Sequence, residues 1–142
     1  MREEFGTGRP SAPRASVRPR ALVLLAAMLF VESAFLAAAA GFLVFELATV
    51  VPVSYASAIA ILLLVALAAL WLFVVAVNTL KGRSWVRGAA LTWQVLQLAI
   101  ALGSFQGLFA RDDIGWFLLV PAVIVLFLLF TRSVIAATTR RS

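Results

Sequence analysis

Four long apolar segments separated by short polar connectors make up most of the chain. They cover about residues 21–45, 56–80, 88–109 and 116–137, and each approaches or exceeds the roughly 20 helical residues that cross a hydrocarbon core of about 30 Å. Backbone groups find no water in lipid, so spans are helices or closed barrels, and the period-two alternation of barrel strands is absent. The pattern predicts an all-α membrane protein, an antiparallel bundle of four transmembrane helices that forms one domain over residues 21–137.

The two ends of the chain are polar. Residues 1–20 are rich in Arg, Pro, Ser and Gly and have no apolar period, which predicts a disordered basic arm. Residues 138–142 form a short basic tail. The apolar run after the arm is longer than the core of a secretory signal, about 7 to 15 residues, and it contains Glu32. We therefore interpret this run as a transmembrane span.

The composition excludes most enzyme classes. Hydrophobic residues make up 64% of the chain and charged residues 13%, against about half and about a quarter in soluble domains. The absence of Cys and His excludes disulfides, thiolate and imidazole metal sites, and histidine general-base catalysis. Motifs for phosphate-binding loops, nucleophile elbows and zinc-protease helices are also absent. We expect no catalytic residues, no cofactor and no metal, and we interpret Asp112 and Asp113 as part of a solvated loop.

The 12 Lys and Arg residues indicate an orientation in the membrane. All but Arg111 lie in the basic arm, in the connector 81–87 or between residue 132 and the C-terminus. The positive-inside rule therefore places both termini in the cytoplasm, as expected for a multi-pass protein of the cell (cytoplasmic) membrane. Aromatic residues agree, with Trp85 at the inner interface and Tyr55 and Trp116 at the outer one. Topology explains the net charge of +6, so we expect no nucleic-acid partner.

Glu32 lies inside the first apolar segment. At about 1.5 Å per residue from position 21 it is roughly 16 Å deep, near the midplane of the membrane, where no Lys or Arg is placed to pair with it. The cost of burying an unpaired charge favours the neutral acid, so its hydrogen bonds decide its role. Gln97 of the third segment reaches a similar depth, roughly 13 to 14 Å, and is the expected partner.

The third segment has a polar face. At about 100° per residue, its small and polar residues fall within roughly 80° of each other, with Trp93 at the border. These residues are Ala90, Gln94, Gln97, Ala101 and Ser104. The face predicts a buried polar cluster of Glu32, Gln94 and Gln97.

The cluster has two interpretations. It can be a packing contact, with each hydrogen bond worth about 0.6 to 2 kcal/mol in a bilayer, or a protonatable site on a transport path. A single acid without a second ionisable relay group favours packing, including packing on another protein.

Small residues form another face of the first segment, roughly opposite Glu32. At this spacing they let a second helix approach closely. They are Ser33, Ala34, Ala37, Ala38 and Gly41. The approaching helix is either the second segment, with its Ala66, Ala69 and Ala76, or a helix of a different chain. A membrane-protein partner and a homo-oligomer both stay open.

The connector between the second and third segments is basic and aromatic. Gly82 permits a tight turn, and Lys81, Arg83, Trp85 and Arg87 lie around it. We expect this patch to bind anionic headgroups of the lipid bilayer, with each basic residue contributing on the order of 1 kcal/mol. Topology alone explains the charges, so specific recognition of a lipid or protein is the alternative.

Two short motifs resemble known membrane proteins. A Gly-Arg-x-Trp-x-Arg stretch at residues 82–87, followed by Trp-Gln-Val-Leu-Gln at 93–97, resembles the small four-helix membrane proteins frequent in high-GC Gram-positive bacteria. This resemblance implies a fold and a location without an assigned activity. The chain is also similar to the small multidrug exporters, which have four helices and an essential Glu in the first, matched here only by Glu32. It departs from them in its basic arm, its charge bias and the absence of a Gly-rich crossing motif.

Together, these features predict a non-enzymatic accessory or interaction subunit of the cytoplasmic membrane. The chain has little catalytic equipment, and its small-residue faces suit packing against partner helices. The alternative is a proton- or cation-coupled exporter of small molecules that uses Glu32.

Overall fold

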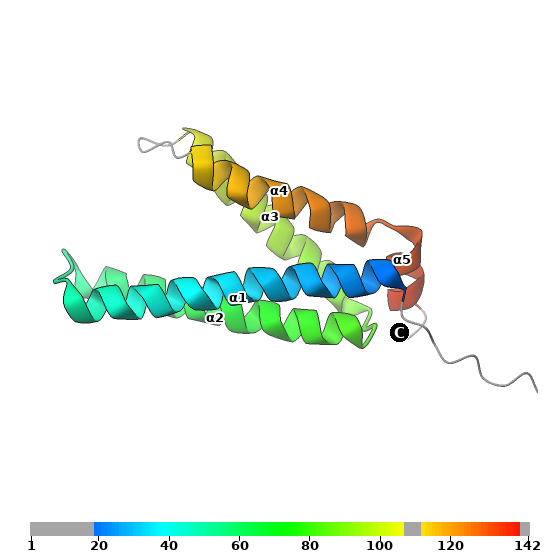
Figure 1. Ribbon diagram of the computed structural model, residues 1–142, viewed down its shortest axis with the longest axis horizontal. Coiled ribbons are helices and arrows are strands. Elements are labelled where there is room, and N and C mark those ends of the chain that lie inside the picture. Colours follow the sequence, from blue (N-terminus) through cyan, green and yellow to red (C-terminus); the bar gives the residue numbers. More distant parts are fainter. Residues whose placement is uncertain (1–18, 107–111, 140–142) are drawn as a thin grey trace, which may run out of the picture.

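Helices are the only regular secondary structure in residues 19–106 and 112–139, which are the residues that the computed structural model describes. They form α1 (Arg20–Thr49), α2 (Tyr55–Leu80), α3 (Trp85–Gln106), α4 (Asp112–Leu129) and α5 (Arg132–Thr139) (Figure 1). Helices α1 to α4 are long and apolar enough to cross a membrane. The all-α class and the four long apolar helices are thus confirmed.

The helices form two hairpins. Helices α1 and α2 lie side by side and run in opposite directions, and α3 and α4 form the second pair (Figure 1). The hairpins meet at the end of the molecule that holds the α2–α3 connector and α5, which we call proximal (Figure 1). They diverge toward the α1–α2 connector, at the end that we call distal. The four helices therefore do not pack together over their whole lengths, as they would in a closed bundle.

The α2–α3 connector is a tight turn built on Gly82. This glycine has a φ of 67°, in the left-handed region that other residues adopt only with strain. Its N–H donates to the carbonyl of Thr79 (3.0 Å), and the N–H of Arg83 donates to the carbonyl of Asn78 (3.2 Å). This pair of bonds is a Schellman motif, which ends α2 and satisfies two of its last carbonyls.

The expected single helix over residues 116–137 is wrong at its C-terminal end. Helix α4 ends at Leu129, and α5 begins at Arg132. The N–H of Phe130 is shared between two carbonyls, those of Leu126 and Phe127, at 3.3 Å each. The carbonyl of Leu128 then accepts from both the N–H (3.2 Å) and the hydroxyl (2.7 Å) of Thr131. These bonds tighten the last turn and release the chain, so that α5 lies across the proximal end (Figure 1).

Three helices also begin or end away from the expected positions. Helix α1 continues beyond residue 45 to Thr49, and α3 begins before residue 88 at Trp85. The expected loop position of Asp112 and Asp113 is wrong, because both lie in the first turn of α4. Carboxylates are favourable there, since they face the positive end of the helix dipole. Residues 1–18, 107–111 and 140–142, which include most of the predicted basic arm and tail, lie outside the described residues.

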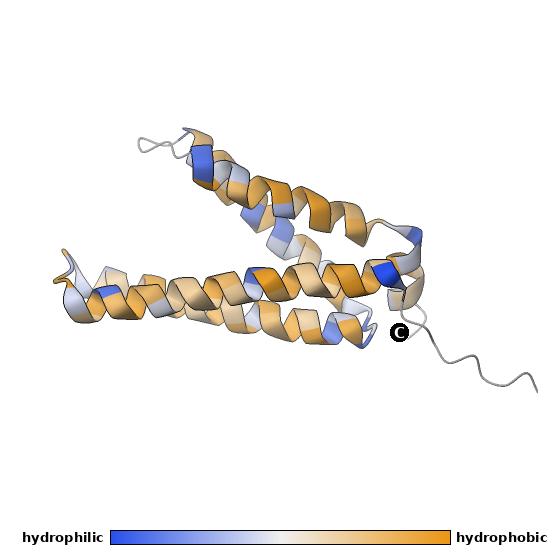
Figure 2. Ribbon diagram, viewed as in Figure 1, coloured by the Kyte–Doolittle hydropathy of each residue, from blue (hydrophilic) through white to orange (hydrophobic). Residues whose placement is uncertain are grey.

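The core lies at the proximal end, where both hairpins meet α5. All five helices contribute fully buried side chains, among them Leu25, Leu29, Leu72, Val75, Val86, Val125 and Val134. Between Ser33 and Ala69, by contrast, no residue is buried. We call this stretch, residues 34–68, the distal arm; it comprises the second half of α1, the first half of α2 and the connector between them. Hydrophilic positions lie at helix ends, along α3 and midway along α1, whereas most of α2 and α4 is hydrophobic (Figure 2).

Candidate functional site

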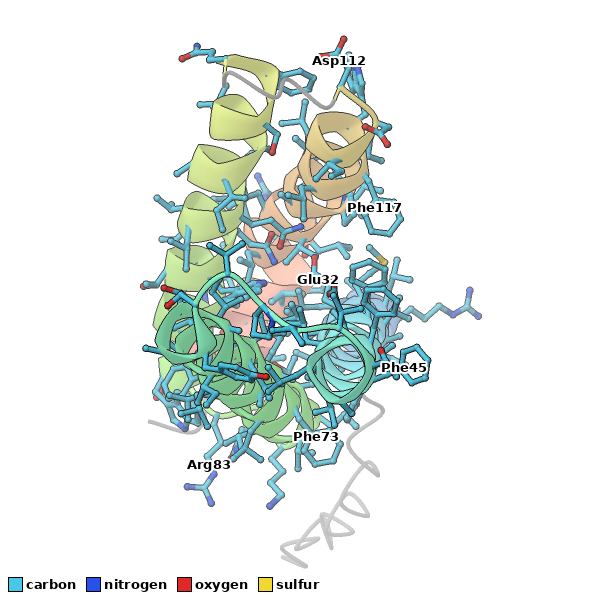
Figure 3. All side chains as sticks on the ribbon, turned by 90° about the vertical axis from the view of Figure 1, so that its left-hand side faces the viewer. Glu32, Phe45, Phe73, Arg83, Asp112 and Phe117 are labelled. Atoms are coloured by element: carbon cyan, nitrogen blue, oxygen red, sulfur yellow. The ribbon has the colours of Figure 1, made fainter. Side chains whose placement is uncertain are left out.

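A polar cluster lies where α1 faces the second hairpin. Glu32 lies near the middle of the molecule, between α1 and the α3–α4 pair (Figure 3). The side-chain amide of Gln94, which is fully buried, donates from Nε2 to Oε2 of Glu32 at 3.3 Å. This hydrogen bond joins two of the three predicted residues, which are 62 positions apart in the sequence.

Gln97 takes a different partner from the expected one. Its Nε2 donates to the backbone carbonyl of Leu118 in α4 at 2.9 Å. Pro121 lies inside α4 and has no N–H, so the Phe117 carbonyl loses its usual helical donor, and Gln97 bonds the carbonyl next to it. Gln97 therefore joins α3 to α4 at the position where a proline weakens α4. Its side chain still lies close enough to the Glu32 carboxyl group to interact with it electrostatically, as does the side chain of Trp93.

Three buried polar atoms of this cluster lack a hydrogen-bond partner in the described part of the chain. They are Oε1 of Glu32, Oε1 of Gln94 and Nε1 of Trp93. A carboxylate and an amide oxygen are both acceptors, so they cannot satisfy each other while Glu32 is ionised. A proton on Glu32 Oε1 turns that atom into a donor, and Gln94 Oε1 is an acceptor of the same amide that already donates to Glu32. The arrangement therefore suits a neutral acid paired with an amide.

The residue next to Glu32 joins the two helices of the first hairpin. The buried hydroxyl of Ser33 donates to the backbone carbonyl of Ala69 in α2 at 2.9 Å. Beyond Ser33 the small-residue face is uncovered, because Ala34, Ala37, Ala38 and Gly41 are all exposed. A Cβ atom added to Gly41 would meet no described atom within 4 Å apart from its chain neighbours and the backbone of its own helix. The close contact with α2 therefore uses only the Ser33 end of this face.

The basic and aromatic residues of the connector face two sides of the molecule. Lys81 and Arg83 are exposed, and Trp85 contacts Trp71 of α2 with ring centroids 6.2 Å apart. Arg87 instead lines a cavity of about 310 Å³ between the start of α3 and the end of α4. Its Nε atom is buried and has no partner among the described residues. Trp85 and Arg87 thus lie on different sides of α3, Trp85 toward α2 and Arg87 toward α4.

Two participants were not predicted from the sequence. The carbonyl of Leu118 carries no side-chain signal, and only the nearby Pro121 indicates that this part of α4 has weakened backbone bonding. Trp93 is at the border of the polar face in sequence, and its indole nitrogen is one of the unpartnered atoms. A buried indole N–H normally finds an acceptor, so the place of Trp93 next to Gln94, at the border of the predicted polar face, was the available signal.

Together the fold and the site define an all-helical protein with four candidate membrane spans and a small, incompletely satisfied polar cluster between its hairpins. Comparison of the chain with models of protein families, with curated proteins and with solved structures finds no match. The resemblance carried by residues 82–87 and 93–97 therefore stays a prediction.

Proposed function

We propose that this protein is a small multi-pass protein of the cytoplasmic membrane that catalyses no reaction and acts as an accessory subunit of another membrane protein. In this proposal its four long helices cross the bilayer in alternating directions. The proximal end, where α1 begins and α5 ends, faces the cytoplasm. The distal arm contacts the partner.

The exposed surface supports a membrane location. Large apolar side chains are exposed around the helices, including Phe42 (64%), Leu63 (63%) and Phe127 (75%). An apolar surface of this extent would drive aggregation in water, whereas lipid tails solvate it. The partly exposed rings of Tyr55 and Trp116 at the distal end and of Trp85 at the proximal end suit the two interfaces.

The exposure of the distal arm is the observation that supports the accessory function most strongly. None of its residues is buried by the rest of the described chain, although α1 and α2 are the longest helices. The second hairpin diverges from it (Figure 1), and Phe35 at its base meets Phe117 of α4 with ring centroids 4.9 Å apart. The arm therefore offers two helices to the membrane with few contacts from α3 and α4.

The small-residue face suggests the kind of partner. In lipid, helices associate through close packing and hydrogen bonds, and small residues allow backbones to approach. Ala37, Ala38 and Gly41 form such a surface and are not covered by α2. We infer that it receives an apolar helix of a different membrane protein, and a second copy of this chain is the alternative occupant.

Crosslinking in intact membranes, followed by purification in mild detergent, tests this function. We expect one protein of reproducible mass to copurify with the chain, and Gly41→Leu to abolish most of this association. Gly103→Leu is the matched control, because Gly103 also lies in a long helix and an added Cβ there meets no atom within 4 Å. An adduct of twice the 15.3 kDa chain identifies a homo-oligomer. A chain that purifies alone and turns over a soluble substrate would contradict the proposal.

A second candidate function is proton- or cation-coupled export through Glu32. The observation in its favour is that Oε1 of Glu32 is buried and has no partner among the described residues, as expected of a group that exchanges a proton. This function requires Glu32→Gln, which keeps hydrogen bonding but cannot ionise, to abolish transport while the protein stays folded. Substrate-induced proton release that is lost in this variant would replace the accessory function with export.

A further inference from the structure

An apolar groove runs between α2 and α3. Its volume is about 590 Å³, and its walls include Leu64, Trp71 and Val74 of α2 and Trp93 and Leu96 of α3. Thr92 also lines the groove, but its hydroxyl donates to the carbonyl of Gly88 in its own helix at 2.9 Å. The groove therefore suits a hydrocarbon.

The length and position of the groove match one leaflet of a bilayer. From Leu64 to Val74 the helix rises by about 15 Å, at about 1.5 Å per residue, which is half of a hydrocarbon core of about 30 Å. Val74 and Ala89 mark its proximal end, and Leu64 and Leu96 mark its other end near the middle of the two helices. A transmembrane helix of a partner would need a groove across both leaflets, whereas an acyl chain needs one.

Positive charge lies at the proximal end of the groove. The α2–α3 connector carries Lys81 and Arg83, and both side chains are exposed. Arg83 extends away from the helices into the surroundings (Figure 3). Trp85 contacts Trp71, a residue of the groove wall, and thereby links the connector to the groove. A ligand with an acyl chain in the groove would thus hold its headgroup beside these cations.

We propose that the α2–α3 groove binds one anionic phospholipid, with an acyl chain along Trp71 and Leu67 and its phosphate beside Arg83. The proposal rests on the membrane location and orientation proposed above, because the charged end of the groove must face the cytoplasmic leaflet. It uses the side of α2 that faces α3, whereas the partner is proposed to contact the small-residue face of α1. A diffuse shell of anionic lipid requires only the charges, whereas this site requires both the groove and the connector.

Native mass spectrometry of the delipidated full chain in mild detergent tests the site. The probes are phosphatidylglycerol and phosphatidylcholine with identical acyl chains, and glycerol 3-phosphate, which carries the charge without the chain. We expect one phosphatidylglycerol to be retained at concentrations where phosphatidylcholine is lost, and glycerol 3-phosphate not to displace it. Equal retention of both lipids, or displacement by glycerol 3-phosphate, would overturn the proposal.

Matched variants separate the groove from the charge. Ala68→Phe fills the groove, and we expect it to abolish retention, whereas Ala66→Phe places the same ring on an exposed position of α2 outside the groove. Arg83→Gln should weaken binding of phosphatidylglycerol about fivefold, which corresponds to about 1 kcal/mol. Arg132→Gln, which removes the same charge from an exposed position at the start of α5, should not weaken it. Retention by Ala68→Phe, or equal weakening by both arginine variants, would overturn the site while leaving the partner-binding proposal intact.

Discussion

Glu32 and its neighbours show how far a single residue could be placed from the sequence. Counting residues along each segment puts Glu32 at a similar depth to the glutamines of the third helix, and in the structure Gln94 is hydrogen-bonded to Glu32. Both glutamines of the predicted cluster lie near Glu32, but Gln94 donates to Glu32, whereas Gln97, the expected main partner, donates to the carbonyl of Leu118. The two glutamines are about one turn, roughly 4.5 Å of helix rise, apart on the same face, so counting residues does not distinguish which of them lies level with Glu32.

Substitutions of Glu32 test whether the cluster stabilises the protein. Glu32→Gln keeps a donor and an acceptor beside Gln94, so we expect little change in the free energy of unfolding. Glu32→Ala leaves the buried Gln94 amide without its acceptor and should cost on the order of 1 kcal/mol. Unfolding in mixed detergent micelles measures both. Equal stability of the two variants would show that the hydrogen bond contributes nothing.

The long helices could be predicted from the sequence more accurately than the residues at which they begin and end. Segments of about 20 apolar residues indicate helices directly, since no other structure satisfies the backbone in lipid. No Gly or Pro in the sequence marks the break between α4 and α5. The break depends instead on the hydrogen bonds of Phe130 and Thr131 to the preceding carbonyls. The pattern of apolar residues does not reflect such local competition between hydrogen bonds, so it could not predict this helix end.

Two glycine substitutions test the turn that joins the hairpins. Gly82→Ala forces a Cβ into the left-handed region at a φ of 67°, and we expect a loss of about 1 to 2 kcal/mol in the free energy of unfolding. Gly88→Ala is the control, because Gly88 lies within α3 and an added Cβ meets no atom within 4 Å. Helix propensity predicts that this change is neutral or stabilises by up to about 1 kcal/mol. If both variants lose the same stability, the turn does not depend on the left-handed residue.

At the scale of the whole molecule, the sequence indicated the four long helices but not which of them pack. Helices that are apolar on most of their surface have no single face to show where a neighbour lies. Exposed Leu63 and buried Leu72 in α2 have the same side chain, and only the tertiary structure distinguishes them. The divergence of the hairpins and the uncovered distal arm therefore could not be read from hydropathy.

Single-cysteine labelling tests the proposed orientation, because the chain contains no cysteine of its own. We expect Val53→Cys, in the distal α1–α2 connector, to react with a membrane-impermeant maleimide in intact cells. Ser84→Cys, in the proximal α2–α3 connector, should react only after the membrane is permeabilised. Both positions are exposed, so accessibility to the reagent depends on the side of the membrane. The reverse pattern would show that the termini face outward.

Site-specific photocrosslinking from the distal arm tests the accessory function most directly. Benzoylphenylalanine replaces either Phe45 in the arm or Phe127 in α4, which are exposed by 64% and 75%. Because the arm is proposed to contact a partner and this face of α4 to contact lipid, we predict a protein adduct of one reproducible mass from position 45 and only lipid adducts from position 127. Lipid adducts alone from position 45, with the protein folded and inserted, would contradict the account.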